Sequence, residues 1–173
     1  MLRLIPTLAF ALLAAFSGAA PESPGAVEFE YGYFCALEPV ATQEAQDTIT
    51  GDVSLVADLP RFIATGPMVP AQLGIGFGVK IRVRPGFAGP VTVVSEHPPM
   101  GPEGVTRQSW HTVFSDIETH YAGFSFEHEY EVLPGTWTLS AQANGRQIYR
   151  VSFNVVAPEK LPRIACDQTV LSS

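Results

Sequence analysis

The sequence predicts an all-β fold, an antiparallel sandwich of about seven strands, and three observations support this prediction. Apolar and polar residues alternate with a period of two in both halves of the chain, most clearly over residues 27–33 and 73–84. Glycine and proline, fifteen of each, recur at short intervals and mark frequent turns. No long stretch follows the 3.6-residue period of an amphipathic helix. Short strands separated by turn residues are typical of a sandwich.

The first twenty residues are predicted to be a secretory signal peptide. Arg3 supplies a positive charge, residues 4–16 are mostly apolar, and the small residues 17–20 fit a cleavage site that ends at Ala20. The apolar stretch is too short to span a bilayer, no second one follows, and no cysteine at the cleavage point could carry a lipid. We therefore expect no membrane anchor, and a mature protein that is periplasmic or secreted.

Length and charge narrow the classes of protein further. Residues 21–173 are enough for one domain, with a flexible start over 21–25, the sandwich over 26–157 and a tail over 158–173. Ten basic and 17 acidic residues give a formal charge of −7, and loss of the leader removes one of the basic residues. A chain this acidic is not expected to bind nucleic acid or anionic lipid non-specifically.

The two cysteines, Cys35 and Cys166, predict a disulfide. An even number of cysteines in an exported protein is most simply paired, and this bond would tie the end of the first strand to the tail. On the chain-entropy model, closing so long a loop stabilises the fold by roughly 4–5 kcal/mol. The alternative, a redox-active pair, usually needs a Cys-x-x-Cys spacing, which the sequence lacks.

The first third of the chain predicts two strands and two irregular segments. Residues 27–33 alternate apolar or aromatic residues with glutamate and glycine, which indicates a strand with one buried face. Residues 36–47 are polar and are expected to form a loop or a short helical turn, and residues 48–57 to form a weaker strand. Residues 58–72 contain several prolines and glycines and are expected to be a loop.

Residues 73–84 are the clearest strand. The apolar residues share one face, and the other face carries three glycines followed by three cations: Gly74, Gly76, Gly78, Lys80, Arg82 and Arg84. The spacing is not that of a dinucleotide-binding turn, because these glycines lie inside a strand. Bare glycines on a strand face instead let another segment or an aromatic ring approach closely.

Further strands are predicted after the turns at 85–90, and they cover residues 91–94, 105–114, 121–133, 137–141 and 149–155. Alternation over 121–133 places His128 on the apolar face. Residues 95–104 are so rich in proline and glycine that no regular structure is expected there, and residues 115–120 are expected to be a connection.

The last hairpin needs a choice of turn. A two-residue turn at Asn144-Gly145 would set Leu139 opposite Arg150 and so mix the core face with the solvent face. We therefore predict a three-residue loop, 143–145, which sets Leu139 opposite Tyr149 and places Gly145 in the left-handed region.

An immunoglobulin-like strand order makes a specific prediction about register. In that order residues 73–84 are strand B and residues 121–133 are strand E, paired antiparallel in one sheet. Three cations would then face three carboxylates across the strands, and the predicted ladder consists of Lys80, Arg82, Arg84, Glu127, Glu129 and Glu131. Such a ladder serves to fix the register, because mispairing would bring like charges together.

Several motifs carry a resemblance to known proteins. Residues 130–139, with Asn144-Gly145-Arg146 and Phe153-Asn154-Val155, resemble the last hairpin of many bacterial immunoglobulin-like domains. Together with Glu30-Tyr31-Gly32 and the glycines and prolines of residues 65–78, they make the mature chain similar to one uncharacterised bacterial family of small, often exported proteins, a domain of unknown function. The resemblance covers most of residues 26–157 and implies a fold, but it assigns no catalytic residue.

Four histidines, His97, His111, His120 and His128, are the first place to look for chemistry. Their spacing fits no tight metal-ligand motif, and the pair His97 and Met100 only faintly resembles exported copper sites. No Gly-x-Ser-x-Gly elbow indicates a hydrolase. A small periplasmic copper or zinc protein, or an enzyme domain, using His97, His111 or His120 stays open as the alternative.

The leading hypothesis is a non-catalytic binding or interaction module without a cofactor, which acts through its loops or an unpaired sheet edge on an unknown protein or envelope component. A purely structural envelope component is a further possibility. The loops 58–72 and 95–104 are the candidate binding loops, because binding residues on sandwiches sit disproportionately on loops. The alternative is that both are plain connections. The candidate binding residues are His97, Pro98, Pro99, Met100, Trp110 and His111.

Overall fold

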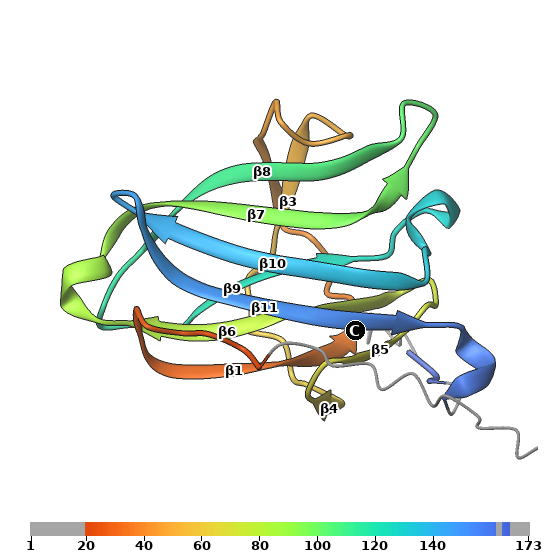
Figure 1. Cartoon of the computed structure of the whole chain (residues 1–173), viewed down its shortest axis with the longest axis horizontal. Coiled ribbons are helices and arrows are strands. Elements are labelled where there is room, and N and C mark those ends of the chain that lie inside the picture. The colour runs from red at the N-terminus through yellow and green to blue at the C-terminus, as the bar shows by residue number, and fades with distance from the viewer. Residues whose placement is uncertain (1–19, 162–163, 167–173) are drawn as a thin grey trace, which may run out of the picture.

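The computed structural model describes residues 20–161 and 164–166, and it contains two sheets packed face to face with a small third sheet beside them (Figure 1). The all-β prediction is confirmed. The predicted signal peptide, except for Ala20, and the tail after Cys166 lie outside the described residues. In the described part of the chain, no helix is both long and apolar enough to cross a membrane.

The first sheet has four strands in the order β4-β1-β6-β9. Their bounds are Ala64–Thr65 for β4, Ala26–Cys35 for β1, Ile75–Val83 for β6 and His120–Ser125 for β9. The apolar alternation of β6 buries every second side chain completely, from Ile75 to Val83. This strand lies in the middle of its sheet because its inner face is apolar and the bare glycines on its outer face let a covering segment come close.

The second sheet has five strands in the order β5-β11-β10-β7-β8. Their bounds are Met68–Pro70 for β5, Arg146–Val156 for β11, Gly135–Ala143 for β10, Gly89–Met100 for β7 and Val105–Phe114 for β8. All pairs are antiparallel except β5 with β11. The remaining elements are the hairpin of β2 (Ala41–Glu44) and β3 (Asp52–Leu55) and the 3₁₀ turns η1 (Pro85–Phe87), η2 (Glu129–Glu131) and η3 (Pro158–Lys160).

The strand order is immunoglobulin-like, as predicted. Strands β6 and β9 pair antiparallel in the positions of strands B and E, while β7, β10 and β11 take those of C, F and G. Between β8 and β9 the chain runs through residues 115–119 alone, so in the described structure no strand lies on the other side of β9.

Aromatic side chains from both sheets fill the core. Trp137, Phe77 and Phe153 are completely buried, and the ring of Phe77 lies 5.4 Å from that of Trp137 and 4.9 Å from that of Phe153. Burial of each such ring stabilises the fold by roughly 1.5–3 kcal/mol. The two alternating faces therefore meet as the sequence predicts.

The predicted cation ladder with residues 127–131 does not form. The register sets Lys80 opposite Tyr121 and Gly76 opposite Ser125, so any continuation of β9 past Ser125 would run beyond the glycine end of β6 and away from its cations. The paired strand also ends at Ser125, after which the Glu131 carboxylate holds the chain: its Oε2 accepts hydrogen bonds from the backbone N–H groups of Glu127 (2.7 Å) and His128 (2.8 Å). His128 is consequently exposed and stacks on Tyr130, not on the apolar face.

The cations of β6 pair with the first strand instead. Lys80 Nζ lies 2.7 Å from Glu30, and Arg82 forms an ion pair with Glu28. The register of β1 against β6 sets these residues directly opposite one another. A register-fixing charge ladder thus exists, but between β1 and β6.

The glycines of β6 lie under aromatic rings and a neighbouring strand, as predicted. A Cβ at Gly76 would lie 2.5 Å from the ring of Phe34, and one at Gly78 would lie 2.4 Å from the carbonyl oxygen of Ala122. The segment before β4 covers this outer face, where Phe62 packs near Phe34. Residues 58–72, expected to be a loop, are mostly irregular but contain the short strands β4 and β5.

Residues 95–100 belong to a strand, contrary to the prediction that residues 95–104 have no regular structure. Strand β7 continues to Met100, only residues 101–104 turn, and β8 begins at Val105. The prolines are tolerated because both ladders of β7 lapse after Glu96, and pairing with β8 resumes only at Met100, so Pro98 and Pro99 need no ladder N–H.

The last hairpin differs from the predicted one. Ala143 pairs with Arg146 around a two-residue turn, in which Asn144 and Gly145 both have positive φ (51° and 73°). A bulge after Ala141 shifts the register by one residue, so that Leu139 faces Val151. The bulge, and not the predicted three-residue loop, keeps the core face of the hairpin continuous. The predicted left-handed conformation of Gly145 is confirmed.

Both ends of the domain are fastened to it. Cys35 and Cys166 form the predicted disulfide, with Cα atoms 5.4 Å apart. Residues 21–25, expected to be flexible, follow β11 instead: Glu22 pairs with Arg150, and Gly25 N–H donates to the carbonyl oxygen of Ile148 at 3.0 Å.

Candidate functional site

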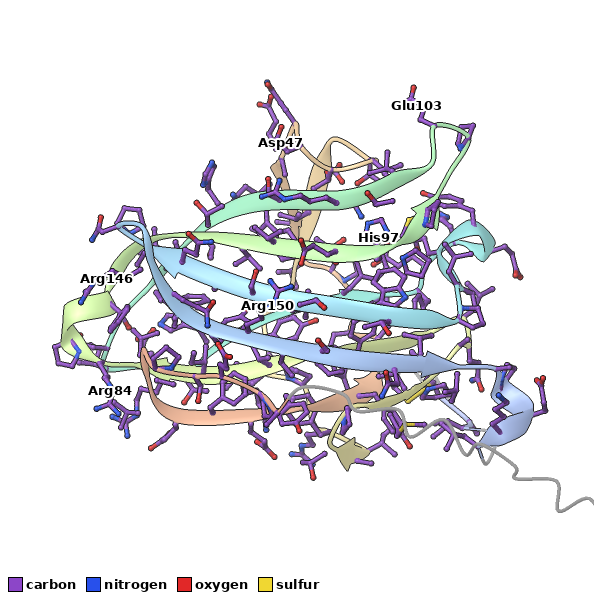
Figure 2. The ribbon with its side chains drawn as sticks, viewed as in Figure 1. Asp47, Arg84, His97, Glu103, Arg146 and Arg150 are labelled. Carbon is purple, nitrogen blue, oxygen red and sulfur yellow. A yellow bond between two sulfur atoms is a disulfide. The ribbon has the colours of Figure 1, made fainter. Side chains whose placement is uncertain are left out.

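The predicted binding residues do not form one exposed loop. His97 and Met100 are buried, Pro98 and Trp110 are half-buried, and Pro99 and His111 are exposed on different strands. Figure 2 shows His97 in the interior beside β7, whereas Glu103 marks the exposed turn that follows. The expected irregular loop is thus wrong for residues 95–100, where His97 and Met100 belong to the interior, whereas residues 102–104 form an exposed turn. Ligand binding by these residues stays a prediction.

His97 joins the interior to the β2–β3 hairpin through a chain of hydrogen bonds. Ile49 N–H donates to Gln108 Oε1 (2.8 Å), the Gln108 amide donates to His97 Nε2 (3.1 Å), and His97 Nδ1–H donates to the carbonyl oxygen of Pro98 (2.9 Å). This chain is consistent only with a neutral imidazole, and burial lowers the pKa of His97 accordingly. The His97 ring also packs on Trp137, with centroids 4.8 Å apart.

A cleft of about 570 Å³ opens at the edge of the sandwich, beside β8 and β9. Most of its lining comes from two uninterrupted runs, residues 52–59 and 118–125. We call this the edge cleft, and its inner wall includes Met100, Gln108 and Trp110. Trp110 is half-buried there, and of the predicted binding residues Met100, Trp110 and His111 line the cleft.

The β2–β3 hairpin is attached to β8 and forms part of the cleft. Ser109 N–H donates to the carbonyl oxygen of Asp47 (3.1 Å), and Gln43 Nε2 donates to that of His111 (2.8 Å). Asp47 lies at the tip of this hairpin (Figure 2). The hairpin thus covers the outer edge of β8, which would otherwise expose unpaired backbone groups.

The edge cleft is strongly acidic. Among the described residues that line it there is no lysine or arginine, and its carboxylates are Asp52, Asp58, Glu118, Glu127 and Glu131. Glu131 is only 7% exposed, and burial raises the pKa of its carboxyl group. Both backbone donors reach its Oε2, which leaves Oε1 without a described hydrogen-bond donor.

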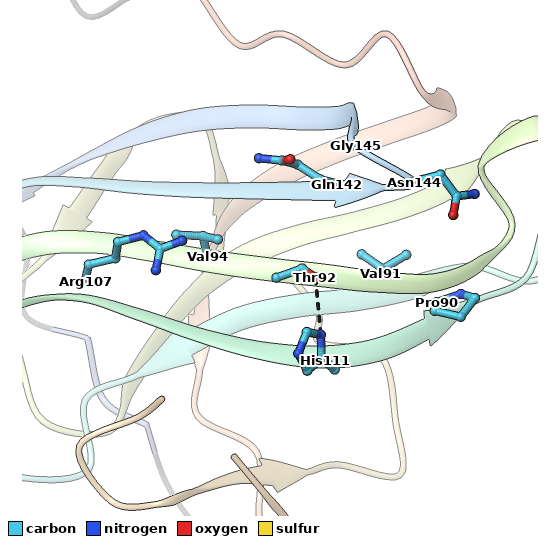
Figure 3. Close-up of a pocket in the computed structure, with 9 residues that line it drawn as sticks. All are labelled: Pro90, Val91, Thr92, Val94, Arg107, His111, Gln142, Asn144 and Gly145. Carbon is cyan, nitrogen blue, oxygen red and sulfur yellow. Dashed lines mark hydrogen bonds between the residues drawn. The ribbon is translucent and has the colours of Figure 1, made fainter. Parts of the chain in front are cut away.

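A second, shallower hollow of about 430 Å³ lies on the outer face of the five-stranded sheet (Figure 3). Arg107, His111 and Gln142 point into it, and Thr92 Oγ1 lies 3.2 Å from His111 Nδ1. Its other wall is the turn at Asn144 and Gly145. Its described lining is about equally polar and apolar, and it includes one cation, Arg107, and no carboxylate.

The predicted metal ligands are not brought together. His97 lies inside the sandwich, His111 is on the outer face of β8, and Ser115 N–H donates to His120 Nε2 at 2.7 Å. Within residues 20–161 and 164–166, no three His, Cys, Asp or Glu side chains are grouped so that they could hold a metal ion. No observation in the described structure therefore favours the metal alternative.

Gln108 and Glu131 matter to the cleft but were missed by sequence reasoning. Gln108 follows Arg107 in an ordinary polar stretch, and its role depends on Ile49, 59 residues away. Glu131 did carry a local signal, because a carboxylate three residues after His128 fits a capping arrangement, which ends a strand rather than extending it.

Comparisons with known proteins relate the chain to a solved structure and to a family model. No curated protein matches the chain. Among solved structures the chain is similar to an immunoglobulin-like protein from Pseudomonas aeruginosa, at 21% identity and a TM-score of 0.49, over 81% of this chain and 99% of that one. The model of a family described as a domain of unknown function, DUF3859, matches residues 22–155. Because that match spans far more than half of the sequence, the chain belongs to the DUF3859 family.

Proposed function

We propose that the protein is an extracytoplasmic, non-catalytic binding module that holds its ligand in the edge cleft. The observation that carries this proposal is the cleft itself, whose volume of about 570 Å³ lies in the range of ligand sites. It combines apolar surface from Met100, Trp110 and Phe124 with a larger share of polar and acidic groups, which suits a polar or cationic ligand more than an apolar small molecule.

The side chains in the cleft support binding rather than catalysis. His120 is held by the backbone N–H of Ser115, and Glu131 is held by two backbone N–H groups. A histidine activates a serine through a ring nitrogen that is free to take the hydroxyl proton. The Ser115 hydroxyl lies 3.3 Å from His120 Nε2, but that nitrogen already accepts the backbone N–H of Ser115 at 2.7 Å, so the pair is not arranged as a base and a nucleophile.

The disulfide supports the extracytoplasmic part of the proposal. Cys35 and Cys166 are 131 residues apart and bonded, and such bonds persist in oxidising compartments. The sequence pattern of residues 1–20 points the same way. If the protein is exported, N-terminal sequencing of the chain recovered from the cell envelope or the medium will begin at Pro21, whereas a chain that retains Met1 in the cytoplasm would contradict export.

Site-specific photo-crosslinking in the exporting cell tests the site. A photoreactive phenylalanine analogue at Leu55, which is 40% exposed and lines the cleft, is expected to give an adduct that a Trp110→Ala change weakens. The matched control is Val113, which is 65% exposed on the outer face of β8 and does not line the cleft. Adducts from Val113 alone, or from neither position, would refute the edge cleft as the site.

A further inference from the structure

We infer that the edge cleft takes an extended, basic segment of another polypeptide, which adds to β9 as a further strand. This inference rests on the proposed function and names the class of ligand. Its starting point is the position of β9, the last strand of its sheet in the described structure.

The topology leaves a place for one more strand. In a constant-type immunoglobulin sandwich, strand D lies beside strand E. Here the chain passes from β8 to β9 through residues 115–119, which is too short to form that strand. The equivalent exposed edge of the other sheet, on β8, is already covered by the β2–β3 hairpin through Ser109 and His111. The edge strands at the opposite ends of the two sheets, β4 and β5, have only two and three residues. Of the described sheet edges that remain unpaired, that of β9, with six residues, is therefore the longest.

The lining of the cleft is that of a strand edge. Side chains alternate between the two faces of a sheet, so a pocket against one face touches every second residue. The edge cleft instead touches all residues of 118–125 and all of 52–59. It therefore runs along the backbones of β9 and of β3 with its extension, where an extended chain could lie.

The register shows which backbone groups of β9 are free. Phe126 N–H donates to the carbonyl oxygen of Ile75, towards β6. In an antiparallel ladder the direction alternates, so the N–H and C=O groups of Tyr121, Gly123 and Ser125 point away from β6. Outside the strand ladders, no described backbone hydrogen bond engages them. Six residues of β9 span roughly 20 Å, which suits a segment of six to eight residues.

Charge selects a basic segment. Glu118 and Glu127 flank the two ends of β9, Asp52 and Asp58 belong to the other run, and the described lining has no lysine or arginine to offset them. A second copy of this chain, with its formal charge of −7, would be repelled. Trp110 and Phe124 add rings on which the stems and heads of lysine or arginine can rest.

Trp110 provides a direct reporter of binding. The chain has two tryptophans, and Trp137 is completely buried in the core while Trp110 lines the cleft. The probe is an acetylated, amidated octapeptide of alternating threonine and valine with a lysine at each end. Two matched peptides carry glutamate at each end, or N-methyl groups on alternate residues. We expect the lysine peptide to change the fluorescence of Trp110 and to slow hydrogen exchange at Tyr121, Gly123 and Ser125.

The variants separate charge from backbone pairing. The double change Glu118→Gln and Glu127→Gln should weaken the lysine peptide by about tenfold or more, because two flanking charges are lost. Glu103→Gln, at the exposed turn between β7 and β8, is the matched control and should leave affinity unchanged. The N-methylated peptide should not bind, since it cannot form the ladder.

Each other outcome overturns the inference. Equal binding of the lysine and glutamate peptides removes the charge argument, and equal binding of the N-methylated peptide removes strand addition. A dimer in sedimentation equilibrium that blocks the cleft would make a second copy the occupant. If no peptide binds while the crosslinker at Leu55 still captures a ligand, this inference fails and the proposed function stands; if the crosslinker also captures nothing, both fail.

Discussion

At the scale of single residues, the buried His97 links the interior of the sandwich to the β2–β3 hairpin through hydrogen bonds. Its imidazole accepts a hydrogen bond from Gln108 and donates one to Pro98, so a second ring proton would face the Gln108 amide, which is also a donor. Gln108 in turn accepts a hydrogen bond from the backbone N–H of Ile49 in the β2–β3 hairpin. Protonation of one buried ring therefore acts on the element that borders the cleft.

The sign of the resulting pH dependence follows from the direction of the pKa shift. Burial lowers the pKa of His97 in the folded state, so the unfolded chain takes up a proton first, near pH 6.5. The stability from the neutral ring is present above that pH and is lost as the pH falls through it. Glu131, whose pKa is raised by burial, acts in the opposite sense at more acidic pH.

Urea unfolding at pH 7.5, 6.5 and 5.5 measures this effect. The free energy of unfolding should fall across the series in the wild type and fall less in His97→Asn. His111→Asn, at an exposed histidine, should behave like the wild type. An identical pH dependence in His97→Asn would show that another group is responsible.

Gly78, on the outer face of β6, shows how a single residue without a side chain lets the neighbouring strand pack closely. A Cβ at Gly78 would lie 2.4 Å from the carbonyl oxygen of Ala122 and 2.9 Å from the ring of Tyr121. Gly78→Ala should therefore destabilise the protein by about 1–3 kcal/mol in denaturant unfolding, as overpacking does. In Gly86→Ala the nearest atom is 3.7 Å away, on a flexible arginine, so its change should stay within about 0.5 kcal/mol. Equal costs at the two positions would contradict the packing argument.

At the scale of elements, the β2–β3 hairpin depends on a few long-range hydrogen bonds. Two of them reach β8 through backbone groups, and the third ends on the buried side chain of Gln108. A two-stranded hairpin is marginally stable alone, so its order comes from this attachment.

Gln108→Leu should loosen the hairpin. The change leaves Ile49 N–H and His97 Nε2 without their partner, which costs about 1–3 kcal/mol for each buried group left unpaired. Hydrogen exchange of residues 43–53 should become faster while that of β10 and β11 stays unchanged. Gln43→Leu removes a more exposed bond and should have a smaller effect. Uniform acceleration throughout the domain would instead indicate global destabilisation.

For the whole molecule, the Cys35–Cys166 bond closes a loop of almost the entire domain. It joins the end of β1 to the segment after β11, where Gln72 Nε2 also donates to the carbonyl oxygen of Ile164 at 2.8 Å. The double change Cys35→Ser and Cys166→Ser should lower the free energy of unfolding by about 4–5 kcal/mol on the chain-entropy model. Reduction of the wild type should bring its urea midpoint to that of the variant. A midpoint unaffected by either treatment would show that the bond adds no stability.

The sequence by itself determined the features that depend on local alternation. Alternation established the two-sided strands and the close approach at the strand glycines. The presence of two cysteines predicted the partnership of Cys35 with Cys166, and the immunoglobulin-like strand order predicted the pairing of β6 with β9. These could be predicted because a period of two assigns each side chain to a face, and an oxidised pair of cysteines has a single solution.

Only the tertiary structure decided where strands end and what lies at their edges. The end of β9 depends on the carboxylate of Glu131, and the core face of the last hairpin depends on a bulge that no local pattern marks. The edge cleft depends on Gln108 meeting Ile49 across 59 residues. Alternation specifies the faces of strands, whereas edges are specified by contacts between distant segments, and the candidate site of this protein lies at an edge.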